Sequence, residues 1–205
     1  MRYLLFNKPY DVLCAFTGEA GQTTLKAYID VPDVYPAGRL DQDSEGLVFL
    51  TDDGPLAHAL TSPERRHEKT YLVMVEGNIP PEALAKLQAG MEVKGVRVGR
   101  IKALVIPQPE LWERSKPVTP HGPTTWLRLT LTEGKKRQIR HMTAAVGYPT
   151  LRLVRVAIDV LALGDLLPGQ WRDLSDAELA LLKKSIASTR PRRGTPAQPP
   201  RRRST

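Results

Sequence analysis

The chain has 205 residues, 41% of them hydrophobic, and a formal net charge of +8, and six arginines lie in its last sixteen residues. This length and apolar content suffice for the core of one large domain or of two small lobes. The single cysteine, Cys14, excludes a disulfide framework and a cysteine-rich zinc site. The sequence shows neither a signal peptide nor an apolar run of about 18 residues, so we expect a soluble cytoplasmic protein without a membrane segment.

The first part of the chain alternates short apolar runs with turns that are rich in glycine, proline and aspartate. Such runs predict strands, and the run at 68–77 is apolar on both faces, as a strand in the interior of a sheet would be. In chain order we expect a strand at 3–6, a short helix at 24–29, a strand at 47–51, one or two helical turns at 56–60 and a strand at 68–77.

The second part contains clearer start and stop signals. Two prolines open a helix at 80, Ser175 and Glu178 form a capping box, and the five prolines of residues 107–123 indicate a loop. In chain order we expect a helix at 80–89, a hairpin at 91–106, the loop, a strand at 126–132, a helix at 135–146, a strand at 151–160 and a helix at 179–186.

The order of these elements predicts the fold class. Strands and helices follow one another without a regular βαβ rhythm, which favours an α+β fold with a mixed, largely antiparallel sheet flanked by helices. We expect residues 1–188 to form the folded domain, as one body or as two lobes. We expect residues 189–205 to be a disordered, basic tail, because a composition rich in arginine and proline cannot bury a core.

Three acidic side chains, Asp41, Asp43 and Glu45, stand in a Gly- and Ser-containing segment just before the strand at 47–51. We call residues 38–46 the acidic segment. It could be a solvated turn, or a carboxylate site of the kind that magnesium prefers. It could also present a single nucleophilic or basic aspartate held beside a cation, with Arg39 on the same side.

Two further features could serve a polyanionic ligand. The stretch 135–155 contains six Lys and Arg residues and no acid, which is unusual for a merely solvated helix face and suits a polyphosphate. Tyr71 lies in an otherwise apolar strand. It is either a core tyrosine or a ring that stacks on a nucleic-acid base.

Four ordered motifs resemble RNA pseudouridine synthases of the RsuA type: NKP at 7–9, GRLDQDSEGL at 38–47, KTYLV at 69–73, and EGKKRQIRHM at 133–142 with GYPTLRL at 147–153. The resemblance spans residues 4–174 and implies the pseudouridine synthase fold, with an active-site cleft across the sheet. Gln42 and His141 depart from the more usual basic residues. Many relatives have an S4 domain before the NKP motif and this chain has none, so it is most similar to members that modify large-subunit rRNA.

The resemblance implies the isomerisation of uridine to pseudouridine in 23S ribosomal RNA, free or in a pre-ribosomal particle, by a monomer without cofactor or metal. Asp41 would be the catalytic carboxylate, as nucleophile or as base, and Arg140 would pair with it. Tyr71 would stack on the flipped uracil, and Asp43 and Glu45 would shape the loop. The implied RNA-binding residues are Arg39, Lys135, Lys136, Arg137, His141, Leu151, Arg152 and Arg155.

Two other functions compete with this one. A non-catalytic rRNA-binding or ribosome-assembly factor could keep the same fold, but it predicts damage to the aspartate, the tyrosine or the arginine, and all three are present. A glycosidase or nucleoside hydrolase would need a second carboxylate across the scissile bond and would have no use for the basic stretch.

Overall fold

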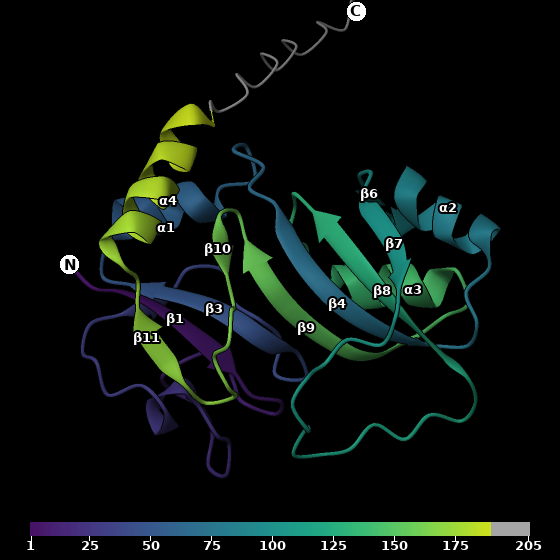
Figure 1. The fold of residues 1–205 in the computed structure, drawn as a ribbon, viewed down its shortest axis with the longest axis horizontal. Helices are drawn as coiled ribbons and strands as arrows, with labels where there is room; N and C mark the ends of the chain where they lie inside the picture. Colours follow the sequence, from purple (N-terminus) through teal and green to yellow (C-terminus); the bar gives the residue numbers. More distant parts are fainter. Residues whose placement is uncertain (190–205) are drawn as a thin grey trace, which may run out of the picture.

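The computed structural model describes residues 1–189, which form an α+β fold built on one nine-stranded sheet (Figure 1). The strands of this sheet are β1 (Tyr3–Lys8), β2 (Tyr35–Pro36), β3 (Glu45–Thr51), β4 (Lys69–Glu76), β7 (Lys102–Ile106), β8 (Thr124–Leu131), β9 (Thr150–Ile158), β10 (Leu161–Ala162) and β11 (Trp171–Asp173). The sheet order is β11-β1-β3-β9-β4-β8-β7, with β2 beside β3 and β10 beside β9.

Four α-helices of the described residues and a separate hairpin surround this sheet. Figure 1 shows two helices at the end of the sheet that holds β1 and β11, and two at the end that holds β7 and β8. These elements are the 3-10 helix η1 (Leu25–Ala27), the helices α1 (Gly54–Thr61), α2 (Pro81–Ala89), α3 (Gln138–Ala145) and α4 (Asp176–Ser188), and the hairpin of β5 (Met91–Val93) and β6 (Val96–Val98).

The strand β3 is buried on both of its faces, and its side chains alternate between two apolar clusters. Leu47 and Phe49 pack with Leu56 and Leu60 of α1 and with Leu182 of α4. Val48 and Leu50 pack on the other face, in the cluster that includes residues of α2 and α3. The acidic segment therefore leads directly into the best-buried strand of the fold.

The pair β3–β9 is parallel, whereas the other strand pairs within residues 1–189 are antiparallel. We call this pair the parallel seam. Gly46 lies in it with φ of 101°, and a Cβ atom there would stand 2.2 Å from the carbonyl oxygen of Arg155. Only glycine allows the two backbones to approach so closely, because any side chain would collide with the neighbouring strand.

The α+β class and the largely antiparallel sheet are confirmed, and β4 lies in the sheet interior as predicted. The capping box is present, since the Ser175 hydroxyl accepts from the Glu178 amide and the Glu178 carboxylate accepts from the Ser175 amide. No helix of the described residues is long and apolar enough to cross a membrane. The predicted disordered tail, residues 189–205, lies outside the described residues apart from Thr189.

Three element predictions were wrong in extent. The helix expected at 24–29 is only the short η1. The hairpin expected at 91–106 ends at Val98, and β7 then joins the main sheet beside β8. The helix expected from Lys135 begins at Gln138, after a turn in which Arg137 adopts φ of 52°. A residue in the left-handed region cannot continue a right-handed helix, so the helix begins after Arg137.

Candidate active site

A cavity of about 630 Å³ opens on the sheet face that carries α3, over the parallel seam. Its walls come from the acidic segment, the start of β4, the middle of β9 and the turn before α3. The cavity is lined by seven of the predicted site residues. They are Arg39, Asp41, Tyr71, Lys135, Lys136, Arg137 and the buried Arg155.

Asp41 lines this cavity, and its carboxylate has no hydrogen-bond or ion-pair partner among residues 1–189. The backbone around it is tightly held, because the Ser44 amide donates to the Asp41 carbonyl at 3.0 Å. Arg39 is exposed at the same cavity, in an irregular stretch and not on a strand. The backbone of Asp41 is thus held in place, while its carboxylate is open to a ligand.

Lys8 belongs to the NKP motif but was not predicted as a site residue, and its buried side chain anchors the acidic segment. Its side chain is fully buried, and Nζ donates to the carbonyl oxygens of Pro9, Val12 and Gln42 at 2.8, 2.7 and 3.1 Å. Burial lowers the pKa of Lys8 from 10.5 to about 8. A lysine that ends a buried strand before a proline is the signal that could have revealed this role.

Arg140 does not pair with Asp41, which corrects the sequence prediction. Its Nη2 donates to the Asp43 carbonyl at 2.7 Å, and its Nε stands 3.3 Å from Asp43 Oδ2. Arg137 binds the same carboxylate through two hydrogen bonds of 3.1 and 2.9 Å. Burial acts to raise the pKa of Asp43, but the hydrogen bonds and charges of the two arginines hold it below its usual value.

Arg152 is not available to RNA, contrary to the prediction, because it forms a buried ion pair on the opposite sheet face. It donates to both carboxylate oxygens of Glu45 at 2.9 and 2.8 Å and to the Trp112 carbonyl at 3.0 Å. Trp112 closes the group by donating from Nε1 to Glu45 at 2.9 Å. The proline-rich loop is thereby attached to the start of β3.

Arg155 is likewise a structural residue and not a phosphate contact. It is 2% exposed, and its guanidinium donates across the parallel seam to the carbonyl oxygens of Leu47 and Gly38 at 2.7 and 2.8 Å. Its two bonds join β9 to the first residue of the acidic segment, Gly38, and to Leu47, the residue just after the segment. A long cationic chain can bridge backbone carbonyls in this way where two strands meet over only a short pairing.

Tyr71 contributes an aromatic wall to the cavity from β4. It is 7% exposed and packs in the apolar cluster with Leu153 and Leu131, which also line the cavity. Leu151, which the resemblance placed against the uracil ring, does not line it. Leu153 occupies that wall because Val73, the residue paired with it, follows Tyr71 by two positions on the same strand face.

The remaining predicted cations lie at the rim. Lys136 is exposed, and Lys135 is exposed beside Glu133, with 3.1 Å between their charged atoms, and also contacts the Arg97 carbonyl. His141 is partly buried on α3 and does not line the cavity. Among residues 1–189, no group of three His, Cys, Asp or Glu side chains is arranged to hold a metal ion.

The chemistry open to this site follows from its contents. It combines one unpartnered carboxylate, an aromatic and apolar wall and a cationic rim. The other acid in the cavity wall, Glu133, is bound by Gln138 and Lys135, so the cavity lacks the pair of free carboxylates that hydrolysis of a glycosidic bond uses. Such a site suits a planar, uncharged ring whose flanking groups are anionic.

Comparison with known proteins agrees with this geometry. The family model for RNA pseudouridylate synthases matches residues 2–145. The chain is 50% identical over 175 residues to ribosomal large subunit pseudouridine synthase E of Vibrio parahaemolyticus, covering 84% of this chain and 74% of the relative. It is 50% identical over 196 residues to the protein of the same name from Xanthomonas axonopodis pv. citri, covering 93% and 97%. A crystal structure of a pseudouridylate synthase superposes with a TM-score of 0.73 at 30% identity, over 88% of this chain and 73% of that one.

Proposed function

The chain belongs to the RNA pseudouridylate synthase family, and we propose that it isomerises a uridine to pseudouridine in the RNA of the large ribosomal subunit. The relatives at about 50% identity carry that substrate class in their names, which supports it here. The single observation that carries the assignment of roles is Asp41, an unpartnered carboxylate in the same cavity as Tyr71. We place this activity in the cytoplasm, where ribosomal RNA is modified.

The reaction needs few groups from the protein. The N-glycosidic bond between N1 and the ribose C1′ breaks, the uracil turns, C5 bonds to C1′, and the proton on C5 leaves while N1 gains one. All atoms of the product are present in the substrate, and the net change is an isomerisation. Asp41 would act at the sugar as nucleophile or base, and the Tyr71 ring would hold the base while it is detached.

The substrate has to leave its stack to reach Asp41. Flipping a base out of an RNA helix costs a few kcal/mol, which contacts to the flanking backbone can offset. The exposed Arg39, Lys135 and Lys136 stand at the cavity and offer such contacts, whereas Arg152 and Arg155 are already engaged within the protein. We therefore assign RNA binding to the first three, with Arg137 as a partly engaged fourth.

Arg140 and Asp43 have a supporting role in this proposal. Arg140 holds the backbone of Asp43 through a 2.7 Å hydrogen bond, two residues after Asp41. Loss of Arg140 should therefore move the acidic segment and reduce the rate, and it should also leave Asp43 with Arg137 alone. Arg140 would thus act on the catalytic acid through the position of Asp43, and not through a direct contact with Asp41.

Release of tritium from ribosomal RNA that contains [5-³H]uridine tests the proposal, because forming the C5–C1′ bond expels that hydrogen. Unmodified large-subunit RNA should release label with the wild-type chain and none with Asp41→Asn. Asp30→Asn, at an exposed aspartate outside the cavity, is the matched control and should act like wild type. Full release by Asp41→Asn, or no release by folded wild type from any large-subunit fragment, would refute the assignment. The second result would favour a non-catalytic RNA-binding factor.

A further inference from the structure

Lys69 points into the cavity from the start of β4 and has no role in the function described above. It precedes Tyr71 by two residues, so the two side chains leave the strand on the same face, and both line the cavity. The side chain is partly buried, and its Nζ donates to one protein group, the His67 carbonyl at 3.2 Å. Two of the three hydrogens of the ammonium group are therefore free for a ligand.

Lys69 has no ion-pair partner among residues 1–189, although Asp159 lies near enough to act on its charge. Arg155 of β9 adds a second cation, and its guanidinium is bound to carbonyl oxygens. Of the nearby acids, Asp159 is held by His67 at 2.9 Å and by Ser185 at 2.7 Å. No carboxylate of residues 1–189 lies within 4.0 Å of the Lys69 ammonium group.

Burying the Lys69 ammonium group raises the free energy of the folded protein unless an anion binds beside it. Burial, together with the charge of Arg155, lowers the pKa of Lys69 from 10.5 to about 8. The rim cations differ, since Arg137 is bound to Asp43 and Lys135 stands beside Glu133. Lys69 is thus a partly buried cation of the cavity wall without an ion pair among residues 1–189, whereas the unpaired Arg39 and Lys136 are exposed to solvent.

We propose that Lys69 is an inner anion site of the cavity that binds a phosphodiester group of the RNA next to the flipped uridine. The inference rests on the proposed function, because it takes RNA as the ligand. A phosphodiester is preferred to a uracil carbonyl as the partner, because Lys69 and Arg155 are adjacent cations and the nearby acid, Asp159, is already bound by His67 and Ser185. Such a pair of cations calls for a full negative charge and not a dipole. The neighbouring Tyr71 ring would then hold the base while Lys69 holds the backbone.

Binding of a phosphodiester at Lys69 requires the ammonium form. RNA affinity should therefore fall as the pH is raised from 7 to 9, as neutral Lys69 becomes more common in the free protein. The other charged groups near Lys69 are Arg155, Asp159 and His67, and the cavity adds Asp41, Glu133, Arg39, Lys135, Lys136 and Arg137. Lys69→Arg separates their contribution, because arginine keeps its charge over this range.

The test measures binding of unmodified large-subunit RNA over a range of salt concentrations. All variants carry Asp41→Asn so that no turnover occurs. Lys69→Met should weaken binding roughly tenfold or more. It should also make the slope of log affinity against log salt shallower by about 0.7 to 0.9, the change expected for one lost phosphate contact. Lys69→Arg should keep the slope and lose the pH dependence, and Lys86→Met, at an exposed lysine of α2, is the matched control.

Two outcomes would overturn the proposal. An unchanged salt slope in Lys69→Met, with a loss of turnover in the Asp41-containing protein, would mean that Lys69 contacts the base and not a phosphate. A less stable Lys69→Met protein with the wild-type slope would make it a structural lysine. The salt slope itself does not depend on the proposed chemistry, which fails separately if the wild-type chain releases no tritium.

Discussion

Breaking the buried ion pair between Glu45 and Arg152 should unfold the protein at markedly lower temperature. The Arg152 side chain is 10% exposed and that of Glu45 is 1% exposed, so neither charge can be solvated if its partner is lost. Arg152→Met removes two hydrogen bonds to the carboxylate and one to the Trp112 carbonyl. Leaving a buried charge unpaired costs about 3–5 kcal/mol. At about 2–4 °C per kcal/mol for a chain of this size, the melting temperature should fall by roughly 6–20 °C.

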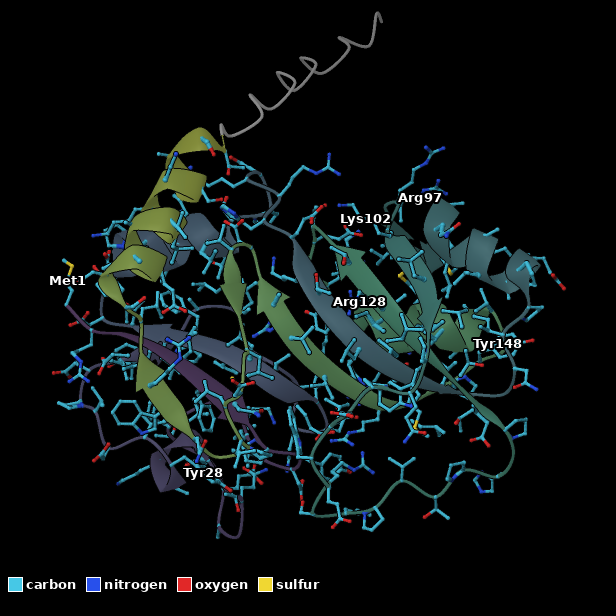
Figure 2. All side chains as sticks on the ribbon, viewed as in Figure 1. Met1, Tyr28, Arg97, Lys102, Arg128 and Tyr148 are labelled. Carbon is cyan, nitrogen blue, oxygen red and sulfur yellow. The ribbon has the colours of Figure 1, made fainter. Side chains whose placement is uncertain are left out.

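A double variant shows whether the penalty comes from the stranded charge. Glu45→Gln with Arg152→Met leaves no charge in the site and keeps an oxygen that can accept from Trp112 Nε1. It should therefore be more stable than Arg152→Met alone, although a carboxylate with two partners has been lost. Arg128→Met is the matched control, because that arginine lies exposed on β8 (Figure 2), where such changes usually stay within about 0.5 kcal/mol.

The assay is urea and thermal unfolding followed by circular dichroism, with tritium release measured at a temperature where every variant is folded. Loss of rate beyond loss of folded protein would show that this pair also positions Asp41, four residues before Glu45. A melting temperature of Arg152→Met within about 2 °C of wild type would refute the reasoning. So would a double variant that is less stable than the single one, since the stranded charge would then not be the cause.

Three further changes test other parts of the same framework. Gly46→Ala should destabilise the fold by about 3 kcal/mol or more, because its Cβ would lie 2.2 Å from the Arg155 carbonyl oxygen. Urea unfolding measures this loss, and a stable alanine variant would contradict the close approach of the two strands. The lowered pKa of Asp43 adds stability at pH values above its unfolded pKa of about 3.9, and this stability is lost as the pH falls through the folded pKa. In Asp43→Asn the free energy of unfolding should therefore depend less on pH in the acid range. An unchanged acid profile would argue against the ion pair. Lys8 and Lys69 both have a pKa lowered to about 8, so between pH 8 and 10 they bind fewer protons in the folded protein than in the unfolded chain. Stability to urea should therefore rise over that range, although the raised pKa of the single buried thiol acts in the opposite direction. A fall in stability would show that these lysines are more solvated than their burial implies.

Much of the fold could be predicted from local sequence patterns, because those patterns record which faces are buried. The alternation at 126–132 and the apolar run at 47–51 identified β8 and β3 to within two residues at each end. The strands β2, β10 and β11 were missed, since two or three residues are too few for a period to show. The parallel seam also left no signal in the pattern, because it depends on β9 returning past β4 to reach β3.

The site was predicted less completely than the fold, and charge explains the difference. A run of cations without acids indicates an anion, but it cannot distinguish an RNA phosphate from a carboxylate or carbonyl elsewhere in the chain. Arg152 and Arg155 proved to bind Glu45 and backbone carbonyls more than 100 residues away in the sequence. Long-range partners of this kind are set by the sheet order, which the sequence pattern does not contain.

The acidic segment shows how three similar carboxylates come to have different roles. Glu45 opens β3 and points to the face where Arg152 is buried, and Asp43 meets Arg137 and Arg140 at the turn before α3 and on α3 itself. Arg137 and Arg140 are thereby occupied, and Asp41 remains the unpartnered acid of the segment within residues 1–189. Its availability is thus a consequence of its neighbours' ion pairs, so a variant that releases Arg140 from Asp43 should reduce catalysis by supplying Asp41 with a competing protein partner.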